Sequence, residues 1–159
     1  MRAARSKHTG AAALEAAIVL PVMVLMLLFL VQGGIAIFRS NQVTTQAREA
    51  ARYASVHGGD WARETKKKCP TQAEIVSAAV TPLAQSMDTA NLTCTIEWIE
   101  EATGNAVAWD SATHDVASTD ANSRTMTNRV RVTVTYRSTG VFLLGTLTFK
   151  SVSELPMSF

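Results

Sequence analysis

The chain has 159 residues, of which 47% are hydrophobic and 18% are charged, and its formal net charge is +2. This length is enough for one modest domain and a short additional segment. The first ten residues hold three Lys and Arg residues and no acidic residue, so the rest of the chain is nearly neutral. The charge distribution therefore gives no reason to expect a nucleic-acid partner.

The apolar residues gather near the N-terminus, and no charged side chain occurs from Ala16 to Phe38. As a helix this segment rises about 35 Å, which exceeds the hydrocarbon core of a bilayer at about 30 Å. We therefore expect a transmembrane helix over residues 11–38, preceded by a basic leader at residues 1–10. The positive-inside rule places the leader in the cytoplasm and the long C-terminal part outside it, in a single-pass N-in/C-out topology.

An amphipathic helix is predicted to continue the span over residues 39–57. Its small apolar residues fall on one stripe at helical spacing: Val43, Ala47, Ala50, Ala51 and Ala54. Gly58 and Gly59 then end the pattern. A face of small residues needs a partner, and the sequence leaves open whether this is the rest of the chain or a neighbouring subunit.

Residues 58–159 are predicted to form an extracytoplasmic α+β domain. A basic turn is followed by a second predicted helix over residues 71–87. Thr71 and Glu74 form a capping-box pattern at its start. The apolar face of this helix is expected at Ile75, Ala78, Ala79, Leu83 and Met87.

Alternation of period two predicts strands in the C-terminal part of that domain. The clearest run covers residues 129–136, and another covers residues 92–98. Shorter strands are expected at 107–109, 141–144 and 146–153, and the Ser-, Thr- and Asp-rich stretch at 111–128 is predicted to be a long loop. The expected fold is a small 3–4 stranded antiparallel sheet packed with one helix, following the long N-terminal helix.

The two cysteines, Cys69 and Cys94, lie in the part expected outside the cytoplasm. In an oxidising compartment a cysteine pair favours a disulfide over a metal site. The bridge would close a loop of about 25 residues and contribute about 3 kcal/mol in the loop-entropy model. The alternative is a pair of unrelated thiols.

No catalytic constellation is found in the sequence. His57 and His114 have neither a cysteine nucleophile nor helical metal-ligand spacing beside them, and phosphate-binding and nucleophile-elbow motifs are absent. The acidic stretch around His114 lacks the oxygen spacing of a calcium loop, which favours a solvated loop. We therefore predict no enzymatic activity, no cofactor and no metal, and a structural or interaction role.

One ionisable residue stands at the edge of the expected span. Glu15 is the first charge after Lys7, and a charge there is costly unless it reaches the interface or finds a partner. A free amine at Ala11, one helical turn away, would be such a partner, and cleavage after Gly10 would create it. The alternative is that Glu15 reaches the interface beside Lys7 or His8.

Three blocks of this sequence, in this order, resemble the TadE-like family. They are Gly-Ala-Ala-Ala-Leu-Glu at 10–15, Ala-Ile-Val-Leu-Pro at 17–21 and Gln-Ala-Arg-Glu-Ala-Ala-Arg-Tyr-Ala at 46–54. TadE-like proteins are minor pilins or pseudopilins of the tight-adherence (Flp) type IV pilus system of bacteria. With the preceding basic stretch, the resemblance covers about a third of the chain. The chain departs from the family pattern at Ala16, where an aromatic residue is usual, and at 32–34, where Gln-Gly-Gly replaces Glu-Phe-Gly.

The resemblance implies a prepilin peptidase that cuts between Gly10 and Ala11 in the bacterial cytoplasmic membrane. Glu15 would then pair with the Ala11 amine of an adjacent subunit and set the axial register. The C-terminal domain would act with other Tad pilins at the pilus tip or the assembly platform. The alternative function is a membrane-anchored sensor or binding module that keeps its leader. A secreted enzyme is disfavoured because the apolar run is long for a signal peptide and no small-x-small cleavage site follows it.

Overall fold

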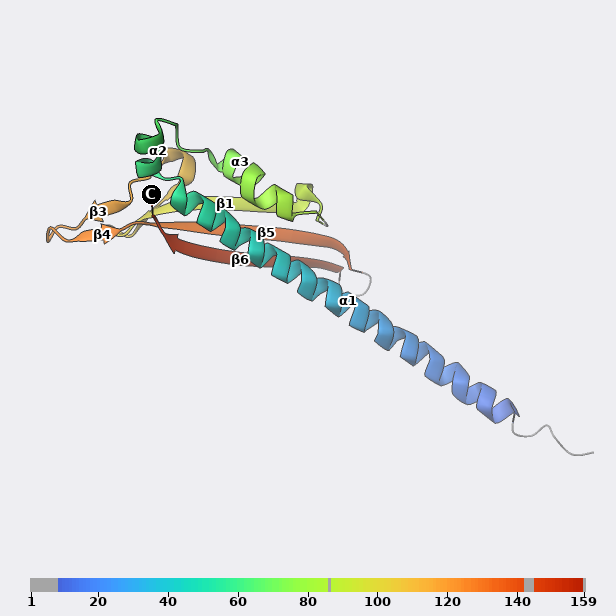
Figure 1. The fold of residues 1–159 in the computed structure, drawn as a ribbon. Helices are drawn as coiled ribbons and strands as arrows, with labels where there is room; N and C mark the ends of the chain where they lie inside the picture. The colour runs from blue at the N-terminus through green and yellow to red at the C-terminus, as the bar shows by residue number, and fades with distance from the viewer. Residues whose placement is uncertain (1–8, 86, 142–144, 159) are drawn as a thin grey trace, which may run out of the picture. The chain divides into compact units, whose positions relative to one another are not determined.

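A computed structural model describes residues 9–85, 87–141 and 145–158. The chain divides into two compact units at the boundary between Ile37 and Phe38. The first unit holds the N-terminal part of α1 (Thr9–Val56), and the second holds the rest of α1 and every later element (Figure 1). Most of the expected leader, residues 1–8, lies outside the described residues, so the domain bounds proposed from the sequence stay predictions.

The second unit is built on a four-stranded antiparallel sheet with helices on one face (Figure 1). Its strands lie in the order β2-β1-β5-β6. Their bounds are β1 (Leu92–Glu100), β2 (Asn105–Ala108), β5 (Arg129–Val141) and β6 (Gly145–Pro156). The predicted α+β class, with a small antiparallel sheet after a long apolar helix, is therefore confirmed.

The alternation predicted in β5 decides which face of the sheet is buried. The residues that face the helices are at most 4% exposed: Val130, Val132, Val134 and Tyr136. The intervening residues lie on the opposite face, where Arg131 makes ion pairs with Glu97 of β1 and Glu154 of β6. One face of the sheet is thus apolar and covered, whereas the other is polar.

The C-terminal part of α1 packs its small-residue stripe against the covered face of the sheet. Each member of the stripe is at most 1% exposed: Val43, Ala47, Ala50, Ala51 and Ala54. They belong to one core cluster with β1 and β5, and Phe149 and Leu155 of β6 pack against it. Of the two partners that the sequence left open, the stripe therefore contacts this chain's own sheet.

The segment predicted as a second α-helix is helical but irregular. Its capping box is formed, because the Thr71 hydroxyl accepts from the Glu74 N–H and the Glu74 carboxylate accepts from the Thr71 N–H. Helix α3 (Gln72–Ile75) then continues as a π turn, η1 (Val76–Val80), and a 3₁₀ turn, η2 (Thr81–Leu83). Pro in η2 explains the change, since it has no N–H and its ring would clash with the carbonyl four residues back.

The π turn shifts the buried face of this segment. The buried residues are Ile75, Ala79, Val80, Ala84 and Met87. The prediction was wrong for Ala78 and Leu83, which are exposed. A turn with one extra residue rotates every later side chain relative to a regular helix.

Three further elements differ from the sequence predictions. The expected basic turn contains a short helix, α2 (Gly59–Thr65), and the expected long loop contains a two-stranded ribbon, β3 (Ala117–Thr119) with β4 (Thr125–Thr127). Strand β2 ends before Trp109, which opens a 3₁₀ turn, η4 (Trp109–Ser111). Residues 142–144 of the expected strand at 141–144 lie outside the described part of the chain.

The free edge of β1 is covered by a side chain. Strand β2 pairs with β1 only from Glu97 to Glu100, which leaves the first half of that edge without a strand. The Gln72 amide lies against it, donating from Nε2 to the Cys94 carbonyl at 3.2 Å and accepting at Oε1 from the Ile96 N–H at 3.2 Å. One amide group thus makes the two hydrogen bonds that a neighbouring strand would make.

Asn128 joins the β3–β4 ribbon to the sheet. Its side chain is fully buried. Nδ2 donates to the Asp115 carbonyl at 2.9 Å, and Oδ1 accepts from the Glu101 N–H at 3.0 Å and from the Ser118 hydroxyl at 2.6 Å. Because every polar atom of this amide has a partner, the buried network holds the ribbon without an unsatisfied group.

Replacing Ala50 by Leu should destabilise the second unit, because the added side chain has no space between α1 and the sheet. Overpacking of this kind costs about 1–3 kcal/mol. Thermal unfolding of the detergent-solubilised protein, followed by tryptophan fluorescence, would measure the loss. The control is Ser40→Leu, which adds the same side chain at an exposed position of α1. Equal unfolding temperatures for the two variants would contradict the packing described here.

Candidate functional site

The apolar part of α1 is the first candidate functional feature. Among the described residues, one helix is long and apolar enough to cross a membrane, with a mean hydropathy of 2.7 over its best window. None of that window is buried in the structure. Large apolar side chains left exposed along a whole helix are stable in lipid rather than in water.

The predicted cleavage site lies in the first turn of this helix. Gly10 and Ala11 are both exposed, and a Cβ added at Gly10 would meet no atom within 4 Å. Glu15 is also exposed and follows Ala11 by four residues, so the two share one face of α1. The helix therefore places the three residues together, while their roles in cleavage and assembly stay predictions.

The two cysteines are free thiols in the structure, so the predicted bridge is not formed in it. Cys69 lies between α2 and α3, and its thiol donates to the Gly58 carbonyl at 3.4 Å. Cys94 lies in β1 and packs against the core. Burial raises the pKa of the Cys94 thiol to about 11 and also raises the pKa of Cys69. The pairing of the two cysteines stays a prediction.

His114 has a structural role in this fold. Its Nε2 meets the Trp109 carbonyl at 2.7 Å, and its ring lies against the Trp109 indole. Burial lowers the pKa of His114. Its own carbonyl accepts from the Gly59 N–H at 2.8 Å, and a Cβ at residue 59 would lie 2.9 Å from that oxygen. Gly59 is therefore needed for this close approach, a reason that the sequence did not reveal.

The acidic residues around His114 are held by partners within the fold. Asp115 pairs with Arg63 at 2.6 Å, and Asp110 accepts from the Gln72 N–H at 2.7 Å. Across the residues that the structure describes, no group of three or more His, Cys, Asp and Glu side chains is placed to hold a metal ion. The acidic residues of this region thus attach the loop to α2 and α3.

Comparison with known protein families singles out α1. A family model described as TadE-like protein matches residues 10–52. These residues belong to the TadE-like family. TadE-like proteins are typically non-enzymatic and pilin-like, and the TadE-like segment here begins at Gly10 and ends in the packed part of α1. Neither a curated protein nor a solved structure matches this chain.

Two side chains of the TadE-like segment have roles that sequence reasoning missed. Gln46 is fully buried beside the alanine stripe, where Nε2 donates to the Met87 sulfur at 3.7 Å. Arg39 donates to the Ser138 hydroxyl and lies over the Tyr136 ring at 5.9 Å, which attaches α1 to β5. The helical spacing of Gln46 from the small residues was a usable signal for its burial, whereas no sequence signal pointed to the partners of Arg39.

The two thiols of the reduced protein should differ strongly in reactivity. With a pKa of about 11, Cys94 has only about one thiolate in a thousand molecules at pH 8, and thiolate is the reactive form. We expect iodoacetamide to modify Cys69 at least about tenfold faster than Cys94, as followed by peptide mass spectrometry. Equal rates would contradict the burial of Cys94. Omitting the reductant tests the predicted bridge, since a bridged pair takes up no reagent.

Proposed function

We propose that this chain is a minor pilin or pseudopilin that acts in assembly of tight-adherence (Flp) type IV pili. The observation that carries the proposal is the TadE-like match over residues 10–52, which begins at the glycine of the expected cleavage site. The apolar helix that follows supports an anchor in the bacterial inner membrane. The partners of this function are a prepilin peptidase, other Tad pilins and the pilus assembly platform.

In this function the chain has four parts. Residues 1–10 are the cytoplasmic basic leader, 11–38 the transmembrane helix, 39–57 its extension and 58–159 the extracytoplasmic domain. The peptidase hydrolyses the peptide bond between Gly10 and Ala11, which releases the leader and creates an amine at Ala11. The basic residues of the leader support the N-in/C-out orientation.

Glu15 serves assembly rather than cleavage in this proposal. Its carboxylate pairs with the Ala11 amine of an adjacent subunit and fixes the axial register of neighbouring helices. Such a pair contributes specificity more readily than net stability, because both charges must leave water. The sheet domain then stands outside the cytoplasm, where it initiates or regulates polymerisation at the pilus tip or the platform.

Replacing Gly10 by Val should block processing. Intact-mass analysis of the protein from its own membranes should show an N-terminus at Ala11 only when the peptidase is present and Gly10 is intact. Because a Cβ at residue 10 meets no atom within 4 Å, the substitution should act on the peptidase and not on the fold. Gly33→Val is the matched control, since a Cβ at Gly33 also meets nothing within 4 Å. A wild-type protein that starts at Met1 would instead indicate an unprocessed, anchored binding module.

Glu15→Gln should separate cleavage from assembly. The variant keeps the shape of the side chain and removes its charge, so the N-terminus should still be Ala11. Pilus assembly should fall by more than about tenfold, because the Ala11 amine of the neighbouring subunit loses its partner. Counting pili by electron microscopy, with intact mass on the same cells, gives both results. Normal piliation by this variant would rule out the proposed role of Glu15.

A further inference from the structure

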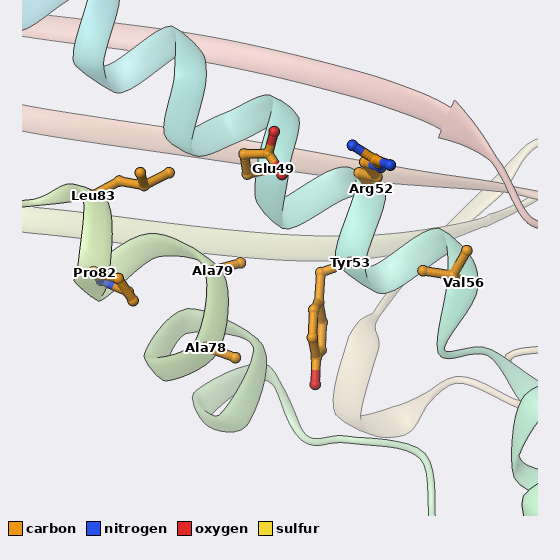
Figure 2. A pocket seen from close by; sticks show the side chains of 8 residues that line it. All are labelled: Glu49, Arg52, Tyr53, Val56, Ala78, Ala79, Pro82 and Leu83. Carbon is orange, nitrogen blue, oxygen red and sulfur yellow. The ribbon is translucent and has the colours of Figure 1, made fainter.

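A groove runs beside α1 in the second unit, with α1 as one wall and the end of η1 with η2 as the other (Figure 2). Its larger hollow has a volume of about 380 Å³. Apolar groups of Tyr53, Val56, Pro82 and Leu83 line it. The groove therefore offers an apolar surface outside the core of the domain.

A second hollow of about 290 Å³ continues the groove toward Phe38. Leu83 lines both hollows and is 38% exposed, although it is a large apolar side chain. On α1 the lining includes Phe38, Thr45 and Val56, which are spaced by two and three helical turns. The two hollows thus form one stripe along about 27 Å of the helix.

Two charged side chains lie on this stripe without an ion-pair partner among the described residues. Glu49 and Arg52 both line the larger hollow and are exposed, and within the described part of the chain neither makes an ion pair. At about 100° per residue they fall on opposite sides of the line through Phe38, Thr45 and Val56. This placement is self-complementary. When two parallel helices face each other along that line, the Glu49 side of one meets the Arg52 side of the other.

We propose that the groove docks α1 of a second copy of this chain, in parallel, with Glu49 of each copy paired to Arg52 of the other. The parallel direction rests on the proposed function, because both copies would leave the same membrane through the same end of α1. Leu83 and Phe38 of each copy are then covered by the helix of the other. The pairing is isologous, so each copy contributes the same surface.

The other surfaces of the second unit are less suited to this partner. On the uncovered face of the sheet, Arg131 is already paired with both Glu97 and Glu154. The open half of the β1 edge is covered by the Gln72 amide. The groove, by contrast, combines exposed apolar side chains with unpaired opposite charges.

Disulfide cross-linking of the full-length protein in its own membranes tests the arrangement. Thr45 is exposed and lies on the central line, so two Thr45→Cys copies should form a covalent dimer when oxidised. The native cysteines are replaced by serine in this experiment. Thr95→Cys is the control, since Thr95 is exposed on the opposite face of the sheet and should give only background dimer.

Charge reversal tests the predicted pairs. In the Thr45→Cys background, Glu49→Arg places like charges across the interface twice and should lower the dimer yield about fivefold. The double variant Glu49→Arg/Arg52→Glu should restore the yield. Glu64→Arg makes the same charge change on an exposed residue of α2 outside the groove, and it should leave the yield unchanged.

Several results would overturn this pairing. They are a Thr45→Cys yield no higher than the Thr95→Cys background, a double variant that does not restore the yield, and cross-links only to a different protein. If serine replacement of the cysteines prevents folding, a photo-reactive benzoylphenylalanine at position 45 of the otherwise unchanged chain makes the same test. Intact mass of these samples reports cleavage after Gly10 separately, so the proposed function and the docking surface fail independently.

Discussion

The close approach of α1 to the sheet is the contact on which the second unit depends. Four alanines on one stripe allow the helix backbone to come near the buried β5 side chains, because each alanine side chain is only a methyl group. This contact brings one helix face, the α3–η1 segment and strands β1 and β5 into a single core. Larger side chains at these positions would separate the layers and expose Val132 and Val134 to water.

The family match extends past the apolar segment into this contact. The TadE-like match ends at Arg52, about four helical turns after the unit boundary at Phe38. It therefore includes α1 residues that pack against the sheet. Gln46 lies in this stretch with its Oε1 buried and without a partner among the described residues. Burial of such an atom costs free energy, which the surrounding packing of α1 offsets.

Regular periodicity was predictable from the sequence, and contacts between distant segments were not. The alanine stripe, the alternation in β5 and the capping box at Thr71 follow from local spacing, whereas Gly10 and Glu15 became candidates through charge placement and the family resemblance. The error at Leu83 has a local cause, because a π turn near Pro82 breaks the period on which the prediction relied. The β3–β4 ribbon was missed because its short polar strands are held by backbone pairing and by Asn128. The groove depends on α1 meeting η2, which no local pattern encodes.

The amide of Gln72 limits how this domain can associate with its neighbours. An unpaired strand edge is a template for any extended chain, so a domain with open edges can associate through its sheet without specificity. By occupying the Cys94 carbonyl and the Ile96 N–H, one side chain blocks this route at β1. Strand β6 forms the opposite edge of the sheet, and it carries Lys150 and ends at Pro156. A lysine or a proline on an edge strand disfavours the addition of another strand. Strand pairing is thereby disfavoured at these two places, which leaves helix side chains as the more selective contact surface of the domain.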